Sequence, residues 1–415
     1  MLHRRRRAGS ELAGTIVSVD APVNASPPAR KKSAPPTLLG MDLAEMETLV
    51  AAAAQPAYRA RQIWKGIYRD RVSELEKVSP LPKLLVQDLV QNQVQVGMPK
   101  LTSRFESQDG TVRYLIELAD GETVETVWMP DGDDGEAGDG SEAGEELPAM
   151  ARKGGGRTWR RATICVSSQV GCAVDCAFCL TATLGVRRSL SAGEIVGQVC
   201  AVLNDRKVSP PHDRVNLVFM GMGEPFLNYD PFVKAVRLLV EGVGIPERRM
   251  TVSTAGIVPK IEQLGKEAIR PKLAISLNAS NDALRTQLMP INRKWNLEKL
   301  IAAAAQFPLR RREKLTFEYV LLGGVNDQPE HARELVKLLG GLPAKINLIA
   351  WNPGPGIEFQ TPDASAVDAF RQVLFKGGIP AYVRRPRGRD IYAACGQLKR
   401  TTGLVQLGSP SPEAL

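Results

Sequence analysis

Fifteen residues, Cys165 to Cys179, read CVSSQVGCAVDCAFC and hold four of the six cysteines in this 415-residue sequence. The last three, Cys172, Cys176 and Cys179, have the spacing CxxxCxxC. Cysteine thiolates are the usual ligands of iron–sulfur clusters. Three protein ligands on a four-iron cluster leave one iron open, as a catalytic metal site requires and a structural site avoids. The spacing therefore predicts a [4Fe-4S] cluster with an open coordination position.

A structural zinc site is the alternative. Such sites close a tetrahedron with four ligands, usually as two separated pairs. Only Cys165, Cys200 or His212 could be a nearby fourth ligand, and none of them belongs to a second pair. The ligand count favours the cluster. A disulfide framework is not expected in a large chain without a secretory signal.

The CxxxCxxC spacing with an aromatic residue, Phe178, before the last cysteine resembles the signature of radical S-adenosylmethionine (SAM) enzymes. This resemblance implies that the open iron binds the amino and carboxylate groups of SAM. It also implies that the reduced cluster cleaves SAM to methionine and a 5′-deoxyadenosyl radical.

The net charge of +9 is unevenly distributed. Residues 1–40 carry seven Lys or Arg and two acids, whereas residues 131–147 carry eight acids and no base, so the remainder is more basic than the total. A basic surface favours a polyanionic partner, although a solvated basic surface has the same composition. With three histidines, histidine-based catalysis is not expected. No apolar run is long enough to cross a membrane, so we expect a soluble, cytoplasmic protein.

The N-terminal part divides into a tail and a helical region. Residues 1–36 are basic and rich in proline, and we expect a disordered tail there and at residues 401–415. Residues 37–100 show helical spacing of apolar residues and predict a small helical accessory domain. Its basic faces comprise Arg59, Arg61, Lys65, Arg69 and Arg71.

Residues 101–162 predict a small β extension. Alternating patterns at Arg113–Leu118 and Thr123–Trp128 predict strands of a small sheet. The acidic, Gly-rich stretch at residues 131–156 predicts a surface insertion between two strands. The main domain is then expected at residues 163–400.

The sequence pattern of the main domain predicts an α/β fold, a partial (βα)6 TIM-like barrel. Short β-branched runs alternate with helical segments, which indicates a parallel sheet with right-handed crossovers, and six repeats rather than eight indicate an open barrel. The expected strands are Thr163–Ser167, Arg214–Gly221, Arg249–Thr254, Lys272–Asn278, Leu315–Leu322 and Lys345–Trp351, with Ala381–Arg385 as a late addition. The expected helices include Ala192–Asn204, Pro231–Val240, Asn296–Gln306 and Glu330–Leu339.

Small and polar residues follow four of these strands, at the end where active sites of such folds lie. Glycine lets the backbone approach a ligand, a glutamate accepts from an ammonium group, and hydroxyls and amides suit a ribose or a carboxylate. One such string is often an ordinary turn, but four at one rim favour a SAM pocket. The strings are Gly221-Met222-Gly223-Glu224-Pro225, Ser253-Thr254-Ala255-Gly256, Ser276-Leu277-Asn278 and Trp351-Asn352-Pro353.

Near the C terminus, residues 384–398 contain five charges around a Pro-Gly turn and then Cys395. The charges suit phosphate contacts, although a solvated loop has the same composition. A lone cysteine is commonly a small buried residue. The basic, small-residue surroundings also allow a reactive thiol.

From about residue 37 to residue 400 the chain resembles the RlmN-type RNA methyltransferases, which methylate C2 of an adenine in 23S rRNA. The N-terminal tail and the insertion at 131–156 are not part of the usual pattern, and Asn278 stands where many members have His. The matching strings are CVSSQVGCAVDCAFC, GQV, GMGEP, VSTAG, AISLNA, MPINRKW, EYVLLGGVND, KINLIAWNP and AACGQL.

The resemblance implies a mechanism that uses two SAM molecules per turnover, because carbon 2 of adenine is not nucleophilic. One SAM methylates Cys395, and a second SAM on the cluster gives the radical that activates this methyl group for addition to adenine. Cys165 then releases the product through a transient disulfide with Cys395. Glu125 is the implied proton acceptor, with Glu122 as a rival.

The resemblance also implies ligands and partners. The implied substrates are 23S rRNA and the adenine 3′ of certain tRNA anticodons, and the helical region is expected to bind the RNA. An electron donor such as flavodoxin and a monomeric enzyme are also implied. Two alternatives are C8 methylation of the same adenine, as in an antibiotic-resistance branch, and a non-catalytic, zinc-stabilised RNA-binding protein. Cys200 has no implied role beyond packing. The implied SAM contacts are Gly223, Glu224, Ser253, Ser276, Leu277, Asn278 and Asn352.

Overall fold

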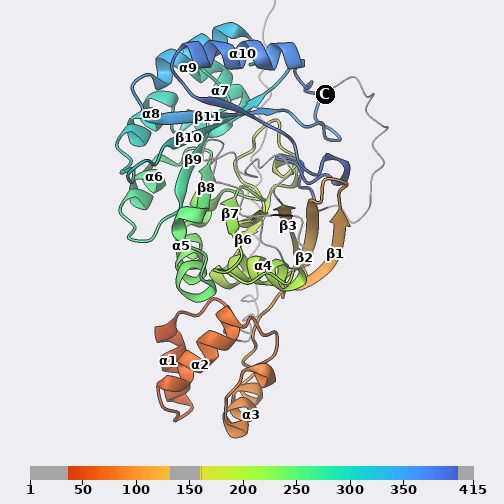
Figure 1. The fold of residues 1–415 in the computed structure, drawn as a ribbon, viewed down its shortest axis with the longest axis vertical. Coiled ribbons are helices and arrows are strands. Elements are labelled where there is room, and N and C mark those ends of the chain that lie inside the picture. Colours follow the sequence, from red (N-terminus) through yellow and green to blue (C-terminus); the bar gives the residue numbers. More distant parts are fainter. Residues whose placement is uncertain (1–35, 131–158, 160, 401–415) are drawn as a thin grey trace, which may run out of the picture. The chain divides into compact units, whose positions relative to one another are not determined.

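The computed structural model describes residues 36–130, 159 and 161–400 (Figure 1). The two tails and the acidic insertion predicted from the sequence lie outside these residues, apart from Pro36. Within the described ranges, no helix combines the length and apolar character needed to span a membrane.

The predicted N-terminal helical region is present. Its first helix is capped by Asp42, whose side chain accepts from Glu45 N at 2.9 Å while the Glu45 carboxylate accepts from Asp42 N at 2.7 Å. This reciprocal capping satisfies two backbone donors at the helix start. The region consists of α1 (Leu43–Ala52), α2 (Tyr58–Trp64), a π-helical turn (Lys65–Arg69), a 3-10 turn (Leu75–Lys77) and α3 (Lys83–Gln91).

Two arginines that were predicted on the basic faces of this region bond to the main domain instead. Arg69 donates to the carbonyl oxygens of Glu241 and Val243 at 3.1 and 3.2 Å. Arg71 donates to the carbonyl oxygen of Val208 at 2.9 Å. These guanidinium groups therefore hold the helical region against the barrel. The sequence predicted these arginines on basic faces, but sequence spacing does not show which part of such a face is covered by another domain.

Among the described residues, ten strands form one sheet in the order β1-β2-β3-β4-β7-β8-β9-β10-β11-β12 (Figure 1). From β4 to β12 every neighbouring pair is parallel, which confirms the predicted open barrel. The bounds are β1 (Lys100–Glu106), β2 (Val112–Glu117), β3 (Thr123–Pro130), β4 (Ala162–Cys165), β7 (Val215–Phe219), β8 (Met250–Thr254), β9 (Lys272–Ser276), β10 (Leu315–Leu321), β11 (Ala344–Ala350) and β12 (Ala381–Arg384).

The sequence suggested a small sheet for the β extension, but its strands belong to the large sheet. Strands β1, β2 and β3 run antiparallel and join the barrel sheet through β3, whose Trp128 pairs with Ile164 of β4. The alternating pattern identifies strands but not the edge on which they pair.

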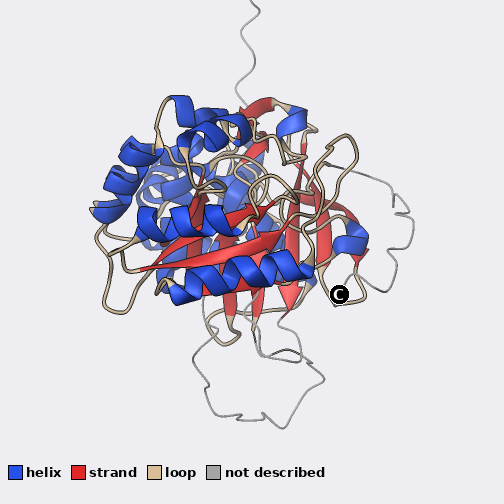
Figure 2. Cartoon of the chain, turned by 90° about the horizontal axis from the view of Figure 1, so that it is seen from above, coloured by secondary structure: helices blue, strands red, loops and turns tan. Residues whose placement is uncertain are grey.

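Helices surround the strands and cover the sheet (Figure 2). The central parallel strands are apolar and buried along their length, as sheets covered by helices require. The predicted helix at 231–240 begins earlier, at Tyr229, and continues into a π-helical turn, Leu239–Val243. The helices of the main domain are α4 (Ala192–Asp205), α5 (Tyr229–Leu238), α6 (Val258–Gly265), α7 (Asp282–Leu288), α8 (Leu297–Ala305), α9 (Pro329–Leu339) and α10 (Ala364–Lys376).

Arg285, on α7, ties the ends of two strands together. Its fully buried guanidinium donates to the carbonyl oxygens of Ala255 at 2.7 Å and Leu277 at 3.1 Å, and to Asn292 Oδ1 at 2.9 Å. These acceptors follow β8 and β9 at the rim where the pocket described below lies. The buried guanidinium thus replaces the hydrogen bonds that the two irregular strand ends cannot make with each other.

We expect Arg285→Met to lower the free energy of unfolding by about 3 kcal/mol, because buried carbonyl groups lose their donors. Urea unfolding of the purified chain measures this value. Arg293→Ala is the matched control: Arg293 is exposed in the turn after α7, and its removal should change the unfolding free energy by less than about 0.5 kcal/mol. Equal effects of the two substitutions would contradict the bridging role of Arg285.

Candidate active site

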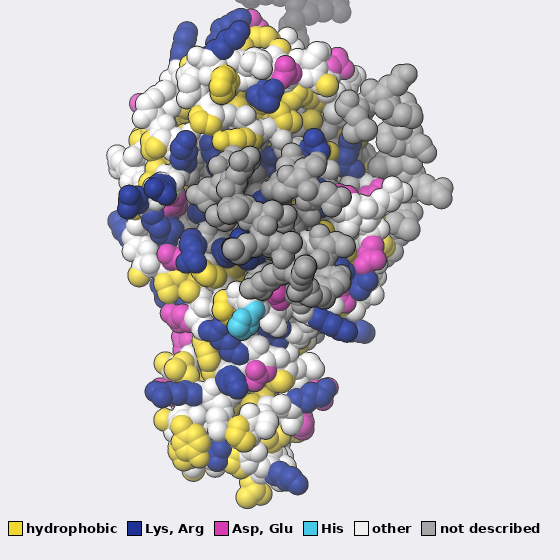
Figure 3. All heavy atoms as spheres, viewed as in Figure 1, with side chains coloured by type: hydrophobic (Ala, Val, Ile, Leu, Met, Phe, Trp, Pro, Cys, Tyr) yellow, Lys and Arg dark blue, Asp and Glu magenta, His cyan; other side chains and the backbone are white. Residues whose placement is uncertain are grey.

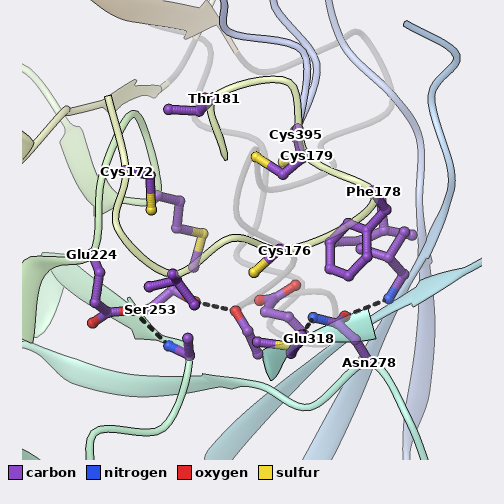
Figure 4. Close-up of a pocket in the computed structure, with 18 of the residues that line it drawn as sticks. Cys172, Cys176, Phe178, Cys179, Thr181, Glu224, Ser253, Asn278, Glu318 and Cys395 are labelled. Atoms are coloured by element: carbon purple, nitrogen blue, oxygen red, sulfur yellow. Dashed lines mark hydrogen bonds between the residues drawn. The ribbon is translucent and has the colours of Figure 1, made fainter. Parts of the chain in front are cut away.

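A pocket opens at the carboxyl ends of the parallel strands, where the sequence placed the site (Figure 4). Four of the predicted strand-end strings contribute to its wall, together with the cysteine motif. The lining residues from the strand ends are Gly221, Gly223, Glu224, Ser253, Thr254, Ala255, Ser276, Asn278, Trp351 and Asn352.

The three cysteines of the CxxxCxxC motif all line this pocket. They lie on the loop between β5 (Gln169–Gly171) and β6 (Val186–Ser189), two short strands that pair antiparallel and close the base of the loop. The loop is fixed by bonds to distant segments: Ala177 N donates to the Leu288 carbonyl oxygen at 3.0 Å, and the Trp351 indole donates to that of Phe178 at 3.1 Å.

The cysteine thiols fit a shared metal centre. Burial raises the pKa of Cys172 to about 12 and that of Cys176 well above its usual value, and the neighbouring cysteine sulfurs raise both further. Each cysteine sulfur makes the negatively charged form of its neighbour less favourable. A positively charged metal centre that all three share would stabilise these thiolates. In the described part of the chain, no three His, Cys, Asp or Glu side chains are grouped to hold a single metal ion. A four-iron cluster differs from such an ion because each thiolate binds its own iron.

Two of the three candidates for the fourth ligand of a zinc site lie away from the motif. Cys200 is fully buried in α4, within the main hydrophobic core, as its predicted packing role requires. His212 is exposed in the loop before β7, at the opposite end of that strand from the pocket. Cys165 does not line the first pocket but lines a second one, to which Cys179 also contributes.

Glu224 connects the ends of two strands. Its carboxylate accepts from Phe226 N at 3.0 Å and from Ala255 N at 2.7 Å. Burial nevertheless raises the pKa of this carboxyl to about 7. Gly223 before it has a φ of +95°, and a Cβ there would lie 2.5 Å from the Cβ of Gln169. The glycine therefore serves close packing of the chain against β5, which the sequence did not indicate.

The stability of the cluster-free protein should depend on pH through Glu224. Its pKa of about 7 in the folded chain lies above the value of about 4.3 for an unfolded one. The protonated carboxyl therefore stabilises the fold at low pH, and this contribution is lost as pH rises through 7. Relative to Glu224→Gln, the unfolding free energy of the wild type should fall by about 2.5 kcal/mol between pH 5 and pH 8. Urea unfolding at both pH values measures it, and a constant difference between the two proteins would contradict the prediction.

The remaining polar groups in the pocket fit a ligand with several donors and acceptors. Ser253 and Ser276 hydroxyls lie 3.1 Å apart. Asn278 has a positive φ of 58° and accepts from Val320 N at 2.8 Å. Asn352 Oδ1 is buried in the pocket wall without a hydrogen-bond partner in the structure, so it is available to a ligand donor.

Leu277 is not brought into this pocket. Its side chain is fully buried in the core, its N–H donates to the Glu318 carbonyl oxygen at 2.9 Å, and its own carbonyl oxygen accepts from Arg285. Both backbone groups of Leu277 are therefore already bonded within the protein. A contact from Leu277 to SAM stays a prediction.

A second pocket adjoins the first and contains the other two cysteines of interest. Cys165, at the end of β4, and Cys395 both line it, and Cys179, Asn352 and Cys395 line the two pockets in common. All six cysteines lie in the described residues, and all are free thiols. The transient disulfide between Cys165 and Cys395 thus stays a prediction.

Cys165 and Cys395 differ in environment within the second pocket. Burial raises the pKa of Cys165 to about 12. Cys395 lies exposed on the pocket wall, where the crowding protein still raises the pKa of its thiol and the Arg384 guanidinium opposes this shift. Arg384 also lies 3.7 Å from the Glu318 carboxylate. Part of the predicted phosphate-binding charge near the C terminus is therefore used inside the protein.

Glu125 is fully buried on β3 and lines neither of the two pockets. It forms an ion pair with Arg113 and accepts from Lys399 N at 2.9 Å. Burial raises the pKa of the Glu125 carboxyl, although the Arg113 guanidinium opposes the shift. Its rival, Glu122, is instead paired with Arg400 at 2.6 Å. A role as proton acceptor stays a proposal for Glu125.

Sequence reasoning missed two residues of the site. Glu318, on β10, lines the first pocket and accepts from Asn347 Nδ2 at 2.9 Å. A glutamate in the middle of an apolar strand was the available signal, because a carboxylate is seldom buried there without a partner. Thr181 lines both pockets, and no pattern in the sequence distinguishes it from an ordinary turn residue.

The fold and the cysteine-lined pocket define a class. Residues 166–336 match the family model described as the radical SAM superfamily. The crystal structure of a radical SAM methyltransferase from Sphaerobacter thermophilus is similar, with 40% identity and a TM-score of 0.78 over 88% of this chain and all of that chain. This superfamily implies a [4Fe-4S] cluster and SAM as cofactors.

Residues 37–94 match the ribosomal RNA large subunit methyltransferase N-terminal domain. A "Probable dual-specificity RNA methyltransferase RlmN" from Koribacter versatilis is 63% identical, covering 84% of this chain and 97% of that protein. A "Dual-specificity RNA methyltransferase RlmN" from Syntrophobacter fumaroxidans is 42% identical, covering 86% and 96%. The chain belongs to the RlmN family of radical SAM methyltransferases.

Proposed function

We propose that this protein methylates C2 of an adenine in 23S rRNA and of the adenine 3′ of the anticodon in tRNAs. The relatives are named as dual-specificity RNA methyltransferases, which supports RNA as the substrate class. The observation that carries the proposal is the shared wall of the two pockets. Cys395 lines the first pocket together with the three cysteines of the motif, and the second pocket together with Cys165.

The cofactors have residues suited to hold them. Cys172, Cys176 and Cys179 would hold the cluster, and the strand-end residues, with Glu224 and Asn352 foremost, would hold SAM. When bound, these cofactors supply a methyl group in a polar step and a 5′-deoxyadenosyl radical in a reductive step, two SAM molecules being used per turnover.

Cys395 is the carrier of the methyl group. Its thiolate sulfur takes the methyl from the first SAM, which leaves as S-adenosylhomocysteine. With both cofactors bound, the methyl carbon on Cys395 would give up one hydrogen atom to the radical that the second SAM supplies, and would then form a carbon–carbon bond to adenine C2. Exposure of Cys395 on the pocket wall supports this role, because the sulfur has to meet both cofactor and base.

Product release is assigned to Cys165 and Glu125. The aromatic ring would be restored when the adduct radical gives its C2 proton to Glu125 and one electron back to the oxidised cluster, which had supplied one electron for the cleavage of SAM. The Cys165 thiolate attacks the Cys395 sulfur, the bond from that sulfur to the transferred carbon breaks, and that carbon takes a proton to become the methyl group. The resulting disulfide is reduced by an external thiol. The Glu125 carboxylate accepts from the N–H of Lys399, which belongs to the same C-terminal segment as Cys395, and this contact supports the assignment.

RNA binding is assigned to the helical region and the basic surface around it. Arg61 and Lys65 are exposed there, and the Arg59 guanidinium lies 4.6 Å from the ring centre of Tyr58, which is 51% exposed. Such cation–aromatic pairs suit stacking on unpaired bases. On the face in Figure 3, Lys and Arg side chains are spread over the helical region and the barrel, with acids among them. An electron donor of the flavodoxin type and a monomeric enzyme complete the proposal.

Nucleoside mass spectrometry of RNA from cells lacking this gene tests the function. We expect 2-methyladenosine to disappear on deletion and to return with the wild-type gene. If 8-methyladenosine follows the gene instead, the position of methylation is wrong while the cofactor chemistry stands. If neither nucleoside changes, the methyltransferase proposal fails, and metal analysis of the purified protein would test the zinc alternative.

A further inference from the structure

The segment that carries Cys395 is attached at both ends to the β extension. Asp390 is attached as well, because the Ser107 hydroxyl donates to its carboxylate at 2.6 Å, so residues 391–398 lie between the attachments and line the second pocket from Ala393 onward. The bonds join Gly388 N to Asp109 (3.0 Å), Arg387 to Asp109 (3.2 Å), Lys399 N to Glu125 (2.9 Å) and Arg400 to Glu122 (2.6 Å).

Between these ends, two hydrogen bonds join the segment to the loop that carries the cluster cysteines. Leu180 N donates to the Gly396 carbonyl oxygen at 2.8 Å, and the Thr181 hydroxyl donates to the Leu398 carbonyl oxygen at 2.7 Å. Both donors directly follow Cys179 in the chain. Only the second bond is made by a side chain, so only this bond can be removed by substitution.

Thr181 is built into this contact. Its side chain is buried, with 4% of the residue exposed, and it lines both pockets. Figure 4 shows Thr181 on the same side of the pocket as Cys179 and Cys395. Gly396, with a φ of +82°, gives the intervening segment a backbone freedom that other residues lack. The Thr181 bond lies two residues beyond this glycine, and the Gln397 side chain, which donates to the Pro353 carbonyl oxygen at 2.8 Å, is the neighbouring contact of the segment.

We propose that Thr181 is a positioning residue whose hydroxyl holds the Cys395 segment in register with the cluster loop. The inference rests on the proposed function, in which one hydrogen atom passes from the methyl group on Cys395 to the 5′-deoxyadenosyl radical. If the methyl group is displaced, the radical takes its hydrogen atom from another donor, such as the thiol reductant of the assay. SAM is then cleaved without methylation of RNA.

The first experiment uses the full chain without its cofactors. Hydrogen exchange measures how often the amides of residues 396–400 open. In Thr181→Val the isosteric side chain leaves the Leu398 carbonyl without its donor, and we expect about tenfold faster exchange in this segment. Thr181→Ser keeps the hydroxyl and should restore slow exchange. Thr183→Val is the matched control, because that hydroxyl bonds at 2.8 Å to the Leu180 carbonyl oxygen within its own turn.

The second experiment uses the reconstituted enzyme with an RNA substrate. The measured quantity is the ratio of 5′-deoxyadenosine released to adenine methylated. We expect this ratio to rise about tenfold in Thr181→Val, with an unchanged KM for RNA, and to stay at the wild-type value in Thr181→Ser and Thr183→Val. A change that only destabilised the fold would lower both products together and leave their ratio unchanged.

The outcomes separate this proposal from the proposed function. Unchanged exchange in Thr181→Val overturns the positioning role, and so does faster exchange with an unchanged product ratio. If the wild-type enzyme methylates no RNA, the proposed function fails and the catalytic part of the role fails with it. The exchange result then still reports whether Thr181 holds the segment.

Discussion

Cys395→Ala should abolish methylation of RNA, with a loss of roughly four orders of magnitude or more, the size expected when a covalent nucleophile is removed. The loss is large because the adenine carbon receives its methyl group only from this sulfur in the proposed mechanism. Cleavage of SAM should continue, since the cluster cysteines and the strand-end residues are intact. The measurements are methylated adenine and 5′-deoxyadenosine from the same reaction.

The matched control is Cys200→Ala. Cys200 is fully buried in α4 and lines neither of the two pockets. Its removal should lower the unfolding free energy by about 1 kcal/mol through the lost packing and leave methylation close to the wild-type rate. Cys395 is exposed, so Cys395→Ala should leave the unfolding free energy nearly unchanged. Methylation by Cys395→Ala within tenfold of the wild-type rate would rule out the carrier role.

Cys176→Ala should have an equally large effect but a different pattern. Losing one of three cluster ligands removes the iron–sulfur chromophore and iron content, and both 5′-deoxyadenosine and methylated RNA should fall to background. The cofactor-free chain should remain folded, because Ala occupies the place of a thiol on a loop held by backbone bonds at Ala177 and Phe178. Visible absorption, iron analysis and product assays together measure the effect.

The contrast between the two substitutions separates the roles of the cysteines. Cys395→Ala keeps SAM cleavage and Cys176→Ala loses it, while a purely structural metal site predicts no cleavage in any variant. Full cluster content and activity in Cys176→Ala would show that the motif does not hold the cluster.

The elements that bind cofactors could be predicted because their chemistry is local in sequence. The spacing of Cys172, Cys176 and Cys179 constrains them to one loop, and alternating strands and helices place the strand ends at one rim. Gly223, Ser253 and Asn352 therefore line the predicted pocket. The apolar strand patterns also allowed the parallel barrel to be predicted from the sequence alone.

The parts that could not be predicted depend on which surfaces meet. Arg69 and Arg71 were predicted to lie on basic faces of the helical region, but their side chains bond to backbone carbonyls of the barrel. The β extension could pair on either edge of a sheet, and only Trp128 against Ile164 in the structure shows which one. Thr181 meets the Cys395 segment 217 residues away in sequence, which no periodicity encodes.

The central claim is that the transferred carbon travels through Cys395 as a methylene group. Supplying the reconstituted enzyme with SAM that carries a trideuterated methyl group tests it in one mass spectrum of the RNA product. Removal of one deuterium by the radical, followed by addition of one solvent proton, predicts methyladenosine with two deuteriums and 5′-deoxyadenosine with one. A methyladenosine that retains all three deuteriums would contradict the account, because it would show direct transfer of an intact methyl group.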